Sequence, residues 1–134
     1  MKIAKHIHTI ICDDIREESE NKVSLMGVYN KEIFVTDIPT ILPTLCFMIS
    51  FEGIKKSLKN FEILLFQDKT KSTLSKFDDF PEDISKINDL RLMAKLTPFR
   101  INKEGIVKIQ MRDPETKKLI KIFEFKITNK AAID

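Results

Sequence analysis

The stretch ICDDIREESENKVSLMGVY, from Ile11 to Tyr29, decides how this chain is organised. Apolar and polar residues alternate on both sides of a polar segment, which is the pattern of two β-strands joined by a turn. Asn21 can adopt the left-handed backbone that closes such a turn without glycine. The stretch therefore predicts a long hairpin, with one strand over residues 5–16 and the other over residues 23–29.

The polar residues of the first strand are the candidate binding residues. Asp14 and Arg16 lie on the same side of the strand as Cys12, and Asp13 lies on the other side. Apolar residues occur on both sides, so either both faces are partly covered or a bulge near the aspartates changes the facing. We favour the bulge. In the structural interpretation Asp14 pairs with Arg16 and Asp13 accepts backbone donors, so that these residues fix the register of the strands.

The rest of the chain continues the two-residue alternation. It predicts six further strands, over residues 33–35, 45–53, 61–66, 90–96, 107–112 and 119–127. In the last of these the apolar side changes between Ile122 and Phe123, which predicts a β-bulge. A helical pattern is confined to the segment that contains Pro81, Glu82 and Asp83, where proline and acids suit a first helical turn. We expect one short helix near residues 80–88.

About eight short strands without alternating helices define an all-β protein. We expect an antiparallel β-sandwich of the immunoglobulin-like or C2-like kind, with a partly open barrel as the main alternative. The ending FRINKEGIVKIQMRDPETKKLIKIFEFKI, residues 99–127, resembles the last hairpin of immunoglobulin-like sandwiches. A length of 134 residues suits one domain, residues 1–134.

The charges give little support for nucleic-acid binding. The chain has 23 basic and 20 acidic residues, and the two signs are interspersed. Two small lysine groups, Lys55/Lys56/Lys59 and Lys117/Lys118/Lys121, are typical of solvated turns. No segment approaches the roughly 20 apolar residues of a membrane span. We expect no nucleic acid and no membrane span, and an unknown protein partner or a homo-oligomer.

The two cysteines, Cys12 and Cys46, both fall in apolar strand patterns. Buried thiols of this kind, together with the absence of a recognisable signal peptide, predict a cytoplasmic protein in which they stay reduced. A disulfide between them requires that their two strands be neighbours.

Three kinds of chemistry would make this chain an enzyme or a metal protein. His6 and His8 point the same way along a strand, as two metal ligands would, but there is no third histidine. Cys12 could act as a nucleophile with His6 or His8, although nearby carboxylates and an apolar strand raise the pKa of a thiol. The three glycines of the chain cannot build a phosphate-binding loop, and we expect no cofactor.

An acidic cluster is the basis of a calcium-binding alternative. It consists of Asp78, Asp79, Glu82 and Asp83. Calcium sites at the loop ends of β-sandwiches use groups of aspartates in this manner. Helix capping by Asp79, with acids near the positive end of the helix, explains the same residues without a metal.

The hairpin motif, followed by LPTLCFMISF, resembles a family of small bacterial proteins without an established activity. Its members begin with the pattern C-D-D-x-R-x-E…G-K-x-S-L-x-G-x-Y…L-P-x-L. The resemblance is strongest between Cys12 and Phe47, and Glu20-Asn21 stands where such sequences have Asn-Gly. It implies a bacterial origin and one compact β domain, and it implies no mechanism.

These observations favour a non-enzymatic binding or accessory module of a bacterial cytosolic system. A calcium- or ligand-binding C2-like module that uses Asp78, Asp79 and Asp83 is the alternative. A thiol or metal-dependent enzyme that uses Cys12 with His6 or His8 is the second alternative.

Overall fold

The computed structural model describes residues 3–55, 58, 60–77 and 88–130, and within them the chain is all-β. The strands are β1 (Ala4–Glu17), β2 (Val23–Tyr29), β3 (Glu32–Val35), β4 (Thr40–Leu42), β5 (Leu45–Ile54), β6 (Glu62–Gln67), β7 (Thr70–Lys76), β8 (Leu90–Leu96), β9 (Phe99–Ile101), β10 (Gly105–Arg112) and β11 (Leu119–Asn129). All eight predicted strands are present, and β4, β7 and β9 are additional. The helix expected near residues 80–88 lies, but for its last residue, outside the described part of the chain.

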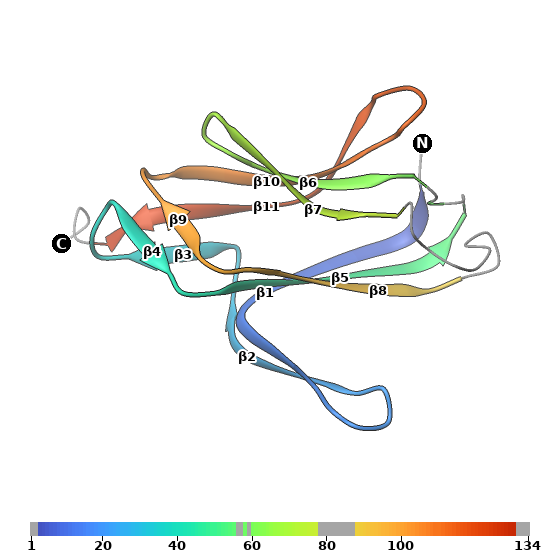
Figure 1. Ribbon diagram of the computed structural model, residues 1–134, viewed down its shortest axis with the longest axis horizontal. Coiled ribbons are helices and arrows are strands. Elements are labelled where there is room, and N and C mark those ends of the chain that lie inside the picture. The colour runs from blue at the N-terminus through green and yellow to red at the C-terminus, as the bar shows by residue number, and fades with distance from the viewer. Residues whose placement is uncertain (1–2, 56–57, 59, 78–87, 131–134) are drawn as a thin grey trace.

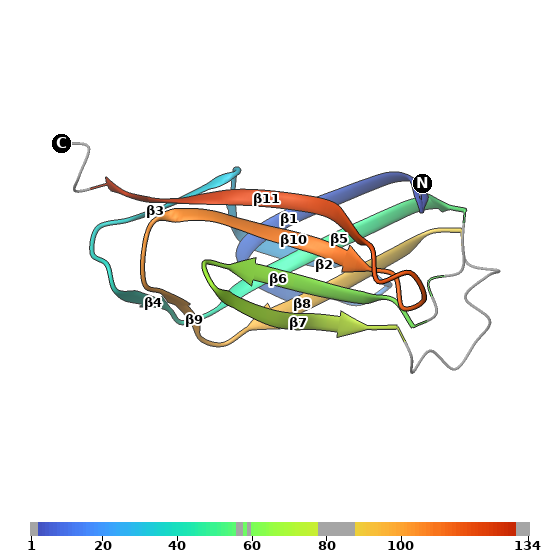
Figure 2. The same cartoon turned by 90° about the horizontal axis from the view of Figure 1, so that it is seen from above.

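The strands form two stacked sheets, which confirms the predicted sandwich-like fold (Figure 1). One sheet has the order β2-β1-β5-β8 and the other the order β3-β11-β10-β6-β7. All pairings in them are antiparallel except that of β3 with β11, which is parallel. Strands β4 and β9 pair with each other at the end of the sandwich that lies away from the N-terminus (Figure 2).

The core fills the space between the two sheets because side chains alternate across each strand. From β5 it receives Leu45, Phe47, Ile49 and Phe51, none of which has measurable exposure. Phe47 meets Phe125 of the opposite sheet with ring centroids 6.2 Å apart. Burial of each such side chain stabilises the fold by about 1.5–3 kcal/mol, so the two sheets are held together mainly by apolar packing.

The bulge predicted in the last strand is confirmed. Phe123 of β11 pairs with Ile109, and the next pair joins Lys121 to Gln110. Ile122 is therefore the extra residue, which explains why the apolar side of the strand changes at this point.

The first hairpin leaves the sandwich beyond Cys12. Figure 1 shows the far half of β1 and β2 projecting from the four-stranded sheet, and we call residues 13–28 the arm. The predicted turn is confirmed, since Glu20 and Asn21 both have φ of 60° and Lys22 N donates to Ser19 O over 3.4 Å. Glu18 N also donates to Lys22 O over 2.8 Å, so residues 19–21 form a three-residue loop between the two strands.

The bulge predicted near Asp13 is wrong. The register of β1 with β2 is unchanged from the pair Ile11 and Tyr29 to the pair Glu17 and Val23. The irregularity lies instead on β2, where Gly27 has a φ of 66°. Both faces of the first strand carry apolar residues because both are partly covered, which was the other interpretation of the pattern.

Candidate functional site

The outer face of the four-stranded sheet lies beside the arm. Along β5 and β8, its residues pair as Cys46 with Lys95, Met48 with Met93 and Ser50 with Arg91. These residues alternate with Phe47 and Ile49, which enter the core, so their side chains point away from the core. The arm therefore faces a surface of thiol, thioether and cationic groups.

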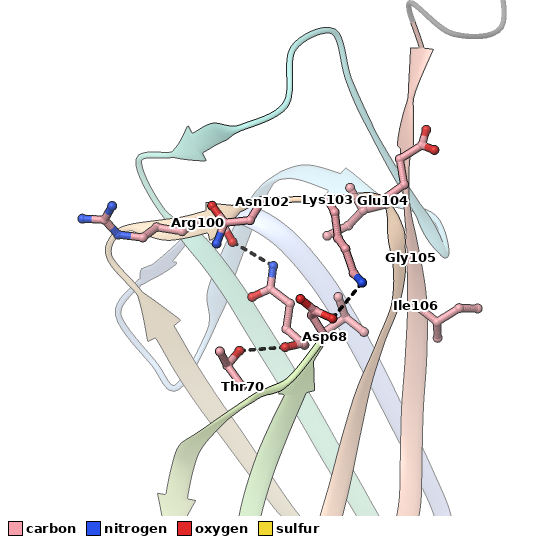
Figure 3. A pocket seen from close by; sticks show the side chains of 11 residues that line it. Asp68, Thr70, Arg100, Asn102, Lys103, Glu104, Gly105 and Ile106 are labelled. Carbon is pink, nitrogen blue, oxygen red and sulfur yellow. Dashed lines mark hydrogen bonds and ion pairs between the residues drawn. The ribbon is translucent and has the colours of Figure 1, made fainter.

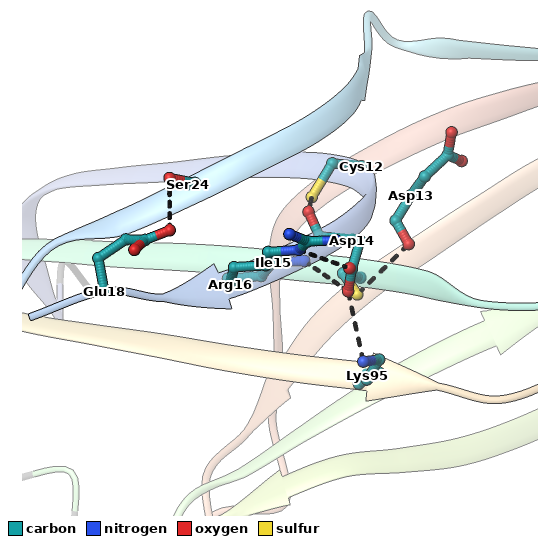
Figure 4. Close-up of polar contacts among 9 residues, drawn as sticks. Cys12, Asp13, Asp14, Ile15, Arg16, Glu18, Ser24 and Lys95 are labelled. Atoms are coloured by element: carbon teal, nitrogen blue, oxygen red, sulfur yellow. Dashed lines mark hydrogen bonds and ion pairs between the residues drawn. The ribbon is translucent and has the colours of Figure 1, made fainter.

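Two polar contacts connect the arm to β8. Asp14 Oδ1 lies 3.3 Å from Lys95 Nζ near the base of the arm (Figure 4). At the tip, Arg91 Nη2 donates to Asn21 O over 3.3 Å. The arm therefore lies over the outer face of the four-stranded sheet and contacts β8 at both its base and its tip.

Two hollows lie between the arm and β8, with volumes of about 320 Å³ and 470 Å³. Ile15 and Glu17 of the arm line the smaller one together with Cys46 and Lys95. Met93 lines both hollows, which makes them neighbours along β8. We call the two together the arm groove.

Asp13 lies at the bend of the arm and does not take part in the groove's ion pair. Its Oδ1 accepts a hydrogen bond of 2.5 Å from the hydroxyl of Tyr29. Burial, the hydrogen bond to this carboxylate and its charge raise the pKa of Tyr29 to about 12. The sequence predicted backbone N–H donors to Asp13, but the donor to its carboxylate is the phenol of Tyr29.

Asp14 makes the ion pair expected with Arg16, whose Nε lies 3.8 Å from Oδ2. It also accepts a hydrogen bond of 3.0 Å from the backbone of Ile15 and pairs with Lys95. The structure therefore brings Asp14 and Arg16 together, whereas Asp13 bonds to Tyr29. Since the Arg16 side chain is 67% exposed, its pair contributes little to stability.

Cys12 and Cys46 lie directly opposite each other on β1 and β5. Both are free thiols, with exposures of 0% and 1%. Cys12 Sγ donates to Asp14 O over 3.4 Å, and Cys46 Sγ donates to Asp13 O over 3.8 Å. The strands are thus the neighbours that a disulfide requires, and both thiols donate to carbonyls at the bend of the arm.

The surroundings of Cys12 oppose a role as a catalytic nucleophile. Burial, followed by the charge of Cys46, raises the pKa of Cys12, and Asp13 and Asp14 raise it further. His8 lies farther back along the same strand, opposite Ser50. These effects disfavour the thiolate form that a catalytic cysteine needs.

His6 and His8 lie on one side of β1, as their spacing predicts. Their rings are stacked with centroids 6.1 Å apart. Within the part of the chain that the structure describes, no group of three or more His, Cys, Asp or Glu side chains could hold a metal ion. The alternative candidates Asp78, Asp79, Glu82 and Asp83 lie outside the described residues.

Strand β2 is an edge of unusual composition. The two larger sheets end at β2, β8, β3 and β7. Strand β8 carries Arg91 and Lys95, β7 carries two lysines and β3 carries Glu32, whereas the VSLMGVY sequence of β2 has no charge. Its Met26 and Val28 side chains are 37% and 57% exposed. An open edge without charges or proline is a surface on which another strand can pair.

A further hollow of about 300 Å³ lies between the turn from β6 to β7 and the connection from β9 to β10 (Figure 3). Its polar groups bond to one another, since Lys103 Nζ lies 2.9 Å from Asp68 Oδ1 and Gln67 Nε2 donates to Arg100 O over 2.8 Å. The Arg100 side chain extends away from the hollow in Figure 3. These contacts join two turns, which is a structural role.

The sequence did not indicate several residues of the arm groove. Arg91, Met93 and Lys95 are the polar-side residues of an ordinary alternating strand, and nothing in their spacing points to a partner about 70 to 80 residues earlier. The sequence could have indicated Tyr29 as a residue of interest, because it is the single tyrosine and stands two residues after Gly27.

Among the described residues no helix is long and apolar enough to cross a membrane. Comparisons of the chain with models of protein families, with curated proteins and with solved structures find no match. The candidate site therefore rests on the geometry of this chain.

Proposed function

We propose that this protein is a non-enzymatic binding module that receives an extended, apolar segment of a partner protein along the edge of β2. The observation that carries the proposal is the lack of charge on this one edge. A segment that pairs with β2 gains main-chain hydrogen bonds, and its side chains can contact Met26 and Val28. The resemblance of the hairpin motif to bacterial proteins adds a bacterial cytosolic setting to the proposal.

The form of the arm supports this function. It projects from the sandwich, so that a partner can reach β2 without displacing core residues. Methionine adapts its shape to different apolar surfaces, and Met26 and Met93 are both exposed. An enzyme is less well supported, because Cys12 is buried and its burial raises the pKa of the thiol.

The proposal can be tested without knowing the natural partner. A library of random peptides displayed on phage is selected on the immobilised protein, and the affinities of the enriched peptides are measured for wild type and variants. Val28→Lys places a charge on the edge and should weaken binding by about tenfold or more, as charges on edge strands oppose pairing.

Ile41→Lys is the matched control, because Ile41 is also exposed, at 49%, but lies on β4. It should leave peptide affinity unchanged. Peptides that bind equally well to wild type and Val28→Lys would exclude β2 as the binding edge.

Self-association through the same edge is the alternative form of this proposal. Two β2 strands can pair antiparallel without placing like charges opposite each other, because the strand carries none. Sedimentation at micromolar concentration distinguishes the two forms. A dimer that Val28→Lys converts to a monomer would identify a second copy of this chain as the partner.

A further inference from the structure

We propose that Cys12 and Cys46 form an oxidisable thiol pair, in which a small hydroperoxide reaches Cys46 first and Cys12 then closes an intramolecular disulfide. Neither the binding edge nor any partner is required for this inference. It rests on the pairing of the two residues, on their unequal access to the arm groove and on the charges around them.

The backbone geometry of the pair suits a disulfide. Residues directly opposite in antiparallel strands have Cα atoms about 4.5 or 5.5 Å apart. Disulfides join Cα atoms about 4.4 to 6.8 Å apart, so both spacings fall in this range. Since Cys12 and Cys46 are such a pair, a bond between them needs no rearrangement of β1 against β5.

The two thiols differ in their access to small molecules. Cys46 lines the smaller hollow of the arm groove with Met93 and Lys95, whereas Cys12 does not. Burial raises the pKa of Cys46, but the charge of Lys95 opposes this effect. Burial also raises the pKa of Cys12, and the charges of Asp13 and Asp14 raise the pKa of both thiols, so the difference between them is the lysine beside Cys46. Cys46 is therefore the better first nucleophile.

The chemistry balances with hydrogen peroxide, the smallest hydroperoxide, as the oxidant. The Cys46 sulfur attacks one peroxide oxygen, the O–O bond breaks, and the thiol proton leaves with the other oxygen as water. The Cys12 sulfur then attacks the resulting sulfenic acid, so that an S–S bond forms, the S–O bond breaks and a second water leaves with the proton of Cys12. The two sulfurs together lose two electrons, which reduce the peroxide.

Disulfide formation also changes the base of the arm. Reduced Cys12 and Cys46 donate their S–H groups to Asp14 O and Asp13 O. A disulfide has no S–H group, so both carbonyls lose these donors.

Peptide mapping of the wild-type protein after treatment with hydrogen peroxide tests the pair directly. Free thiols are alkylated before digestion, and the same chain in denaturant shows that the oxidant is sufficient. The expected product is a peptide in which Cys12 is joined to Cys46 within one chain, reversible by dithiothreitol. Two free thiols in the folded protein, at a peroxide concentration that oxidises the unfolded chain, would overturn the proposal, as would disulfides between chains only.

Two variants test the order of the steps. Cys12→Ser should accumulate a Cys46 sulfenic acid that dimedone traps. Cys46→Ser should lose its remaining thiol about tenfold more slowly than wild type loses Cys46, because Cys12 lacks access to the groove. Circular dichroism checks that both variants are folded. Equal rates of oxidation for Cys12 and Cys46 would contradict the assigned order. The peptide mapping of the wild-type protein does not depend on either variant.

Discussion

Gly27 lies directly against the carboxylate of Asp13, so closely that a Cβ atom at Gly27 would overlap Asp13 Oδ2. This contact stands at the bend where the arm leaves the sandwich. Gly27 also has a φ of 66°, which residues with a side chain adopt only with strain. The backbone angle favours glycine at this position, and a side chain there would also force the Asp13 carboxylate to move.

Gly27→Ala should therefore destabilise the protein by about 1–3 kcal/mol, through the left-handed backbone and the overlap with Asp13. Urea unfolding measures the change. In the double variant with Asp13→Ala, part of the overlap is removed, so its destabilisation should be smaller than the sum of the two single changes. Strict additivity would show that the overlap has no energetic effect.

Tyr29 should make stability depend on pH in the alkaline range. Its pKa is about 12 in the folded protein and near the ordinary 10.0 in the unfolded chain. Below pH 10 both states hold the proton; as the pH rises from about 10 to 12, the unfolded state loses it first, and stability falls. Thermal unfolding of wild type should show this loss, and Tyr29→Phe should reduce it.

The same residue offers a direct optical check. The chain has one tyrosine and no tryptophan, so the phenolate absorbance reports Tyr29 alone. Ionisation of the folded protein with a midpoint near pH 10 would show that the bond to Asp13 and the burial do not hold the proton.

Lys95→Ala should loosen the arm without unfolding the sandwich. The Lys95 and Asp14 side chains are 57% and 35% exposed, so loss of their ion pair should lower the free energy of unfolding by less than about 1 kcal/mol. Hydrogen exchange of amides in residues 13–28 should nevertheless become faster. Lys103→Ala breaks a pair with Asp68 of similar exposure and should leave exchange in the arm unchanged.

Truncation of Phe47 should lower stability far more than truncation of Val28. Phe47 is fully buried between the sheets, so Phe47→Ala should cost about 3–5 kcal/mol of stability. Val28 is 57% exposed, and Val28→Ala should change stability by no more than about 0.5 kcal/mol. Denaturant unfolding of both variants checks this. A large loss for Val28→Ala would mean that Val28 supports the fold and is not a free surface residue.

The fold was largely predictable because alternation with a period of two follows from which side of a strand is covered. It located all eight expected strands and the bulge at Ile122. Strands β4 and β9 are only three residues long, and β7 is the polar sequence TKSTLSK, so none of them shows the apolar alternation on which the prediction depends.

The site was only partly predictable. Local spacing correctly paired Asp14 with Arg16, which are two residues apart. The bulge near Asp13 was wrong because the bend results from Gly27, on the neighbouring strand. The pairs of Cys12 with Cys46 and of Asp14 with Lys95 depend on strand order, which local patterns do not contain.

Hydrogen exchange of the backbone amides, measured with and without a bound library-selected peptide, tests the central claim most directly. If an extended segment pairs with the edge of β2, amides between Val23 and Tyr29 that point away from β1 should gain protection of about tenfold or more, because they become hydrogen-bonded. Protection gained along β8 or β7, with β2 unchanged, would contradict the account.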